Sequence, residues 1–122
     1  MVYYTGIGSR ATPEPILSLM VNIAIYFNNK GYTLRSGGAS GADSAFETGA
    51  GTKKEIYIPW KGFNKSKNKY IEIPEKAFSI ASEFHPVWDK LKDPVKRLHA
   101  RNVMQILGSD LKTPSKLVIC WT

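Results

Sequence analysis

Four short runs of β-branched and aromatic residues recur along the chain, and each is followed by a turn or by the C-terminus. The runs cover residues 2–7, 32–35, 55–58 and 117–121. Runs of this length and composition, bounded by glycine and polar residues, are typical of β-strands. The pattern therefore predicts four strands.

The segment between the first two runs has a helical pattern instead. Its apolar residues recur at spacings of three and four, which places them on one helical face: Ile16, Met20, Ile23, Ala24 and Phe27. Thr12 suits the N-cap of this helix, Pro13 its first turn and Gly31 its exit. The chain is thus expected to open as strand, helix, strand.

Three more helices are predicted after the second strand. An S-x-x-D capping box begins a short helix at Ser40 that runs to about residue 49 or 51. Residues 62–73 are polar, lysine-rich and aperiodic, which predicts an exposed loop before a helix over residues 74–83. Asp93 and Pro94 are expected to be the cap and first residue of a last helix, which has a rough apolar stripe and runs up to Gly108.

The alternation of strands and helices indicates the fold class. Parallel strands joined by right-handed crossovers give a sheet that is covered by helices on both faces. We expect one α/β domain over residues 1–122, a Rossmann-like three-layer sandwich with a mainly parallel sheet in the order 3-2-1-4. Ligands of such sheets bind outside the carboxyl ends of the strands, where the chain order reverses. Here that position lies between the first and fourth strands.

Composition excludes several classes of protein. The 122 residues are 43% hydrophobic and 22% charged, which suits one globular domain. No apolar run approaches the roughly 20 residues that cross a bilayer, and the N-terminus lacks the basic flank of a signal peptide. We therefore predict a cytoplasmic protein without membrane contact. The single cysteine, Cys120, lies in an apolar run and is expected to be a small buried hydrophobe.

The charge of the chain is strongly positive. Seventeen Lys and Arg against ten Asp and Glu give a formal charge of +7, and twelve of the basic residues lie between Lys53 and Arg101. Such a field favours nucleotides, nucleic acid and acidic proteins as partners. Alternatively, the lysines of the predicted loop only form a solvated surface: Lys61, Lys65, Lys67 and Lys69.

Two glycine-rich turns follow the first two strands. The first offers two glycines, a hydroxyl and a guanidinium before a helix: Gly6, Gly8, Ser9 and Arg10. The second runs directly into a helix N-terminus: Ser36, Gly37, Gly38, Ala39, Ser40, Gly41 and Asp43. Glycine lets a phosphate approach the backbone N–H groups, and the helix dipole favours an anion. Either turn alone is more often structural, but both open onto the same sheet edge, so we predict a phosphate site.

Neither turn matches G-x-G-x-x-G or G-x-x-x-x-G-K-S/T, and no residue set predicts a cofactor or a metal. Asp43 and Glu47 stand four apart and are expected to face the pocket together. For Asp43, helix capping combined with a contact to ribose ranks first. Catalysis by either carboxylate at a ribose ranks well behind.

The last predicted helix carries a basic and polar group of residues. Arg97 and Arg101 are four apart and project together, as a phosphate clamp would require. His99 and Asn102 lie beside them. The alternative is a basic surface with His99 exposed to solvent.

The segments YTGIGSR, LRSGGASGADSAFE, HARNVMQILG and KLVICWT occur in this order and cover nearly the whole chain. The chain resembles the DprA/Smf branch of the SLOG superfamily, which includes the LOG-type cytokinin-activating enzymes, and in particular its short stand-alone members from phages and bacteria. The resemblance implies one nucleotide or nucleic-acid pocket built from these positions: Gly8, Ser9, Arg10, Ser36, Gly37, Gly38, Ala39, Gly41, Asp43, Arg101 and Asn102.

One departure from the family limits the functional expectation. Family members continue after the fourth strand into a further glycine turn, which in LOG enzymes carries the catalytic glutamate of a P-G-G-x-G-T-x-x-E motif. Nothing here matches it, so either the sequence is part of a longer chain or a second copy completes the pocket in a homo-oligomer. We expect binding of a phosphorylated nucleotide without turnover. The alternatives are single-stranded nucleic-acid binding, as in DprA, and a nucleotide N-glycosidase using Glu47 or Asp43.

Overall fold

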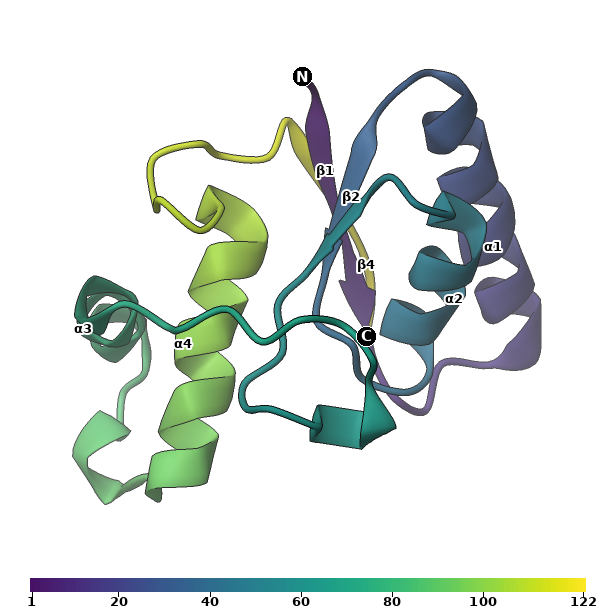
Figure 1. The fold of residues 1–122 in the computed structure, drawn as a ribbon. Helices are drawn as coiled ribbons and strands as arrows, with labels where there is room; N and C mark the ends of the chain where they lie inside the picture. The colour runs from purple at the N-terminus through teal and green to yellow at the C-terminus, as the bar shows by residue number, and fades with distance from the viewer.

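The computed structural model describes residues 1–122 as a four-stranded sheet between two layers of helices (Figure 1). The elements are β1 (Tyr3–Gly8), α1 (Glu14–Asn29), β2 (Thr33–Ser36), α2 (Ala42–Ala50), β3 (Lys54–Ile56), α3 (Glu75–Phe84), α4 (Asp93–Leu107) and β4 (Leu117–Trp121). All strands are parallel, in the order β3-β2-β1-β4. The predicted α/β class and strand order are confirmed.

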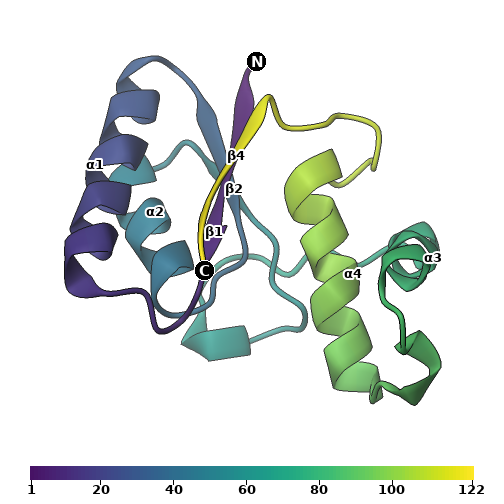
Figure 2. The same cartoon turned by 180° about the vertical axis from the view of Figure 1, so that it is seen from behind.

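The two helical layers lie on opposite faces of the sheet, as the front and back views agree (Figure 2). Helices α1 and α2 cover one face, and α3 and α4 lie on the other. The connections from β1 to β2 and from β2 to β3 run through α1 and α2 on one side of the sheet (Figure 1). The chain crosses to the other side before returning as β4, so the order reverses between β1 and β4 as predicted.

The face under α1 and α2 holds the larger apolar core. Tyr4, Leu34 and Phe46 are almost wholly buried there. Tyr4 packs on Phe27 of α1 with ring centroids 4.6 Å apart. A side chain at Gly6 would bring its Cβ to 2.6 Å from the Phe46 ring, so this glycine lets α2 lie close to β1. Burial of this apolar surface is what holds the two helices on the sheet.

The hydroxyl of Tyr4 is an unsatisfied polar group within that core. It is buried without a hydrogen-bond partner, and burial raises the pKa of Tyr4 to about 12. Tyr4→Phe removes this unsatisfied group and keeps the ring, so we expect stability to rise by about 1 kcal/mol. Urea unfolding followed by circular dichroism measures the change. A loss of stability would mean that the hydroxyl has a partner in solution.

The opposite face of the sheet meets α4 largely through polar groups. Arg35, in the middle of the sheet, is only 2% exposed and donates to the carbonyl of Thr113 at 2.5 Å and to Glu55 Oε1 at 3.2 Å. The Thr5 hydroxyl donates to the carbonyl of Gln105 at 2.5 Å. These bonds satisfy the polar groups that the sheet turns toward the helix.

A second, smaller core lies farther from the sheet, between α3 and α4. Its buried members come from both helices and the segments around them: Tyr57, Ile73, Ala77, Ala100, Met104 and Leu111. The sheet and its polar face therefore separate two apolar cores.

Several local predictions were wrong. Helix α1 has Pro13 at its N-cap instead of Thr12, whose hydroxyl donates to the carbonyl of Ser9 at 2.6 Å. Helix α2 begins at Ala42, two residues after Ser40, with Gly41 at its N-cap. Cys120 is exposed rather than buried, because alternate residues of β4 point away from the core under α1 and α2.

None of the helices combines the length and apolar character needed to cross a membrane.

Candidate ligand site at the strand ends

A cleft of about 760 Å³ opens at the carboxyl ends of β1 and β4, between the start of α2 and the side of α4. We call it the strand-end cleft. It is lined by seven of the residues predicted for the site: Gly8, Ser9, Arg10, Ala39, Asp43, Arg101 and Asn102. The sheet order places it at the reversal point predicted from the sequence.

The other six predicted residues do not line the cleft: Gly6, Ser36, Gly37, Gly38, Ser40 and Gly41. Gly38 lines a separate pocket, and Ser40 is exposed. At Gly37, an added Cβ would lie 2.2 Å from Gln105 Nε2 and 2.8 Å from Asp43 Oδ2. At Gly41, the backbone has φ 80° and ψ −125°, and a Cβ would lie 2.7 Å from the backbone of Ser9 and Arg10. Close packing therefore accounts for these glycines without a ligand, while it also brings the two turns together.

Asp43 ties the second turn to the helix that follows. Its carboxylate is 5% exposed and accepts from the backbone N–H of Ala39 at 3.2 Å. Burial raises the pKa of Asp43 above its usual value, although the Ala39 hydrogen bond and the Arg101 charge act against that rise. The predicted capping box does not form, because Asp43 accepts from the N–H of Ala39, which precedes the helix, and no side chain caps α2.

Arg101 lies at the floor of the cleft and is only 6% exposed. Its guanidinium donates to the carbonyl of Gly37 and, at 3.0 Å, to that of Tyr57, while Nε donates to Asn102 Oδ1 at 3.0 Å. Burial lowers the pKa of Arg101, and Asp43 opposes that shift. Arg101 therefore helps to hold the second glycine-rich turn in position, through the carbonyl of Gly37.

The predicted clamp of Arg97 and Arg101 does not form. Arg97 donates to the carbonyl of Pro59 at 3.0 Å and to the Tyr70 hydroxyl, and it does not line the strand-end cleft. Two arginines four apart do share a helical side, but each finds a different internal acceptor. Arg10 is the exposed arginine of the cleft.

Backbone donors remain available beside Arg10. In the two turns, the N–H groups of Ser9, Ala39 and Ala42 are used within the protein. The N–H groups of Arg10 and Asp43, which both line the cleft, have no acceptor in the protein. The Asp43 N–H belongs to the first turn of α2, and free donors there, with a guanidinium nearby, are suited to an anion.

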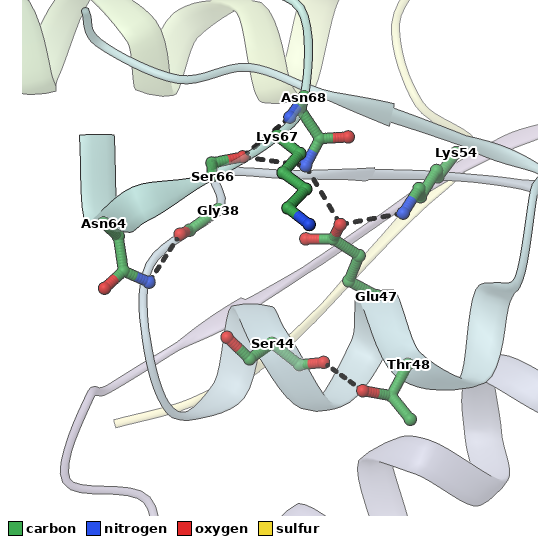
Figure 3. Close-up of a pocket in the computed structure, with 9 residues that line it drawn as sticks. All are labelled: Gly38, Ser44, Glu47, Thr48, Lys54, Asn64, Ser66, Lys67 and Asn68. Atoms are coloured by element: carbon green, nitrogen blue, oxygen red, sulfur yellow. Dashed lines mark hydrogen bonds and ion pairs between the residues drawn. The ribbon is translucent and has the colours of Figure 1, made fainter. Parts of the chain in front are cut away.

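Glu47 does not share the cleft with Asp43, contrary to the prediction. It lies in a separate polar pocket between α2, β3 and residues 64–68, which we call the loop pocket (Figure 3). There its Oε2 accepts from Lys54 Nζ at 2.8 Å and from Asn68 Nδ2 at 3.0 Å. Sequence reasoning missed Lys54 and Asn68, since nothing local links them to Glu47. The only sequence signal near this pocket is the aperiodic, lysine-rich stretch at residues 62–73.

His99 of α4 forms an aromatic group with His85 and Trp88, which precede that helix. The His85 and His99 ring centroids are 4.8 Å apart, and those of His99 and Trp88 are 6.5 Å apart. Burial, and then the charge of His85, lower the pKa of His99 from its ordinary 6.5. His99 also lines the cleft and is partly buried, so it is not the freely solvated residue of the alternative interpretation.

The lowered pKa has a consequence for stability. As the pH falls through 6.5, the unfolded chain takes up a proton at residue 99 before the folded protein does. We therefore expect this contribution to stability to be complete above pH 6.5 and to fade as the pH drops below it. Melting temperatures between about pH 7.5 and 5.5 test this. His99→Gln should flatten the decline, and an unchanged slope would contradict the assignment.

No group of three or more His, Cys, Asp or Glu side chains is placed to hold a metal ion. No protein-family model, curated protein or solved structure matches the chain.

Proposed function

We propose that the strand-end cleft binds a phosphate-bearing nucleotide and holds it without turnover. The observation that carries this proposal is the group of free anion donors at one end of the cleft: the backbone N–H groups of Arg10 and Asp43 and the exposed Arg10 guanidinium. The start of α2 adds the positive end of a helix dipole. A phosphate placed there would meet all of them.

The rest of the cleft suits the other parts of a nucleotide. Phe63, Val95 and Leu98 give it an apolar wall, against which a base can lie. Asn102 is exposed at the lining and can bond to a ribose or base edge. Seven of the eleven residues that carry the resemblance to the SLOG superfamily line the cleft, which adds support for a nucleotide ligand.

The positions of the carboxylates favour binding over catalysis. Asp43 is held by the Ala39 N–H and faces the Arg101 charge, and Glu47 lies in the loop pocket. Neither is free in the strand-end cleft to act as a base. This supports a protein that senses or sequesters its ligand.

Isothermal titration calorimetry with AMP, ADP and ADP-ribose tests the proposal. We expect one of them to bind, and Arg10→Ala to weaken that binding by about tenfold or more, because a charge-assisted bond to phosphate is lost. Lys30→Ala is the matched control, since it removes the same charge from the exposed end of α1. Absence of heat and of any thermal shift with all three compounds would overturn the proposal.

Single-stranded nucleic acid is a second candidate ligand. Lys61, Lys65, Lys67 and Lys69 are all exposed and form no ion pair, so a basic loop borders the sheet edge. An oligonucleotide contacting several phosphates should lose affinity steeply between about 50 and 200 mM salt, whereas one small ligand should lose far less. A flat salt response with oligonucleotides would reject this candidate.

A further inference from the structure

We propose that the loop pocket is a second binding site, for a small sugar phosphate. Its volume is about 620 Å³, and none of its lining residues is hydrophobic. Gly38 lines this pocket and Ala39 lines the strand-end cleft, so the two share a turn but no residue. Because apolar burial contributes nothing here, a ligand must be held by hydrogen bonds and charge.

Glu47 presents one carboxylate oxygen to the pocket. Its Oε2 is occupied by Lys54 and Asn68, at 2.8 and 3.0 Å, while Oε1 has no partner in the protein. The side chain is 23% exposed, so that oxygen is open to a ligand on a carboxylate that is already fixed in place (Figure 3). An ionised carboxylate only accepts hydrogen bonds, and neighbouring sugar hydroxyls are donors that suit it.

Positive charge exceeds negative charge in the same pocket. Lys54 is paired with Glu47, whereas Lys67 has neither an ion pair nor a hydrogen bond and points into the pocket beside Glu47 (Figure 3). Two ammonium groups against one carboxylate favour an anion. A ligand that carries hydroxyls for Glu47 and a phosphate for Lys67 satisfies both groups, which neither a neutral sugar nor free phosphate does.

The pocket is held in shape before any ligand arrives. Asn64 Nδ2 donates to the Gly38 carbonyl at 3.0 Å, and this bond ties the lysine-rich loop to the glycine turn. Asn68 is fixed by Ser66 Oγ, which accepts from its side chain at 2.9 Å and from its backbone N–H at 3.1 Å. Ligand binding therefore costs little conformational entropy at these residues, because they are already ordered.

Titration of the full chain with D-ribose 5-phosphate, D-ribose and inorganic phosphate tests the site. We expect ribose 5-phosphate to bind best. Glu47→Gln and Lys67→Ala should each weaken it by about tenfold or more, as a charge-assisted contact is lost. Lys69→Ala is the matched control, because this exposed lysine of the same loop lies outside the pocket.

Variants of the strand-end cleft separate this inference from the proposed nucleotide function. Arg10→Ala should leave ribose 5-phosphate binding unchanged, even if AMP binding is lost. If Arg10→Ala abolishes ribose 5-phosphate binding while Glu47→Gln and Lys67→Ala do not, the sugar phosphate occupies the cleft and the inference fails. It also fails if inorganic phosphate binds as well as ribose 5-phosphate, or if Glu47→Gln strengthens binding, since either result means that Glu47 accepts no sugar hydroxyl.

Discussion

Gly41→Ala is expected to destabilise the protein by about 3 to 5 kcal/mol, through two separate effects. The residue has φ 80° and ψ −125°, a conformation that only glycine adopts without strain. In addition, the new Cβ would lie 2.7 Å from the Ser9 carbonyl and the Arg10 Cα. These are backbone atoms, so no side-chain rotation relieves the contact, and the two turns must separate.

Gly51→Ala is a control that isolates the first effect. Gly51 has almost the same conformation, with φ 64° and ψ −123°, but nothing lies within 4 Å of its added Cβ. We expect this variant to lose only the strain, about 1 to 3 kcal/mol. Urea unfolding of both variants gives the difference. Equal losses would show that the approach of the two turns contributes nothing to stability.

Arg101→Met is expected to cost about 3 to 5 kcal/mol, although methionine fills much of the same space. The carbonyls of Gly37 and Tyr57 both lose their donor from Arg101, and Asp43 loses the positive charge that it faces. An isolated buried charge and unsatisfied carbonyls are among the most costly defects in a protein interior. The turn behind the cleft should loosen as a result.

A double variant distinguishes the charge from the hydrogen bonds. Asp43→Asn together with Arg101→Met removes both charges and leaves an amide oxygen that can still accept from the Ala39 N–H. We expect this protein to be more stable than Arg101→Met alone, because no unpaired charge remains buried. Lys96→Ala, on the same helix, should change stability by less than about 0.5 kcal/mol. If the double variant is the less stable one, the unpaired charge of Asp43 is not what makes Arg101→Met costly, and the hydrogen bonds of the Asp43 carboxylate contribute more than its burial costs.

The elements could be predicted because their signals are local. Helix α4 begins one residue before the predicted start, with Lys92 rather than Asp93 at its N-cap, and ends before Gly108 as predicted. The four strands fall within about two residues of the predicted runs. The strand order followed from the alternation of strands and helices alone. These features need only hydrophobic periodicity and the handedness of crossovers, and both can be read from neighbouring residues.

The interior roles of charged residues could not be predicted in this way. Arg35 sits in a strand pattern, but its acceptor, the Thr113 carbonyl, is 78 residues away in the chain. Arg97 and Arg101 share a helix face, yet their acceptors are fixed by segments near Pro59 and Gly37. A guanidinium can be buried only where distant carbonyls gather around it, and no local pattern reports such an arrangement.

The strand-end cleft was predicted in part for a related reason. Both glycine turns lie where their strands end, so Ser9, Arg10 and Asp43 come together as expected. Glu47 does not join them. Glu47 lies four residues after Asp43, which is about 6 Å farther along the axis of α2. At that position it lines the loop pocket, on the other side of the glycine turn from the cleft.

The polar contact between the sheet and α4 affects how the molecule opens. The core beneath α1 and α2 is continuous with the sheet, while the core between α3 and α4 is joined to the sheet by side-chain hydrogen bonds of Thr5, Arg35 and Arg101. Water can replace those bonds more readily than it can enter an apolar core. Amide protons of α3 and α4 should therefore exchange through a partial opening that leaves β1, β2 and α1 protected. Because Arg101 and Asn102 belong to α4, that opening would also take the cleft apart.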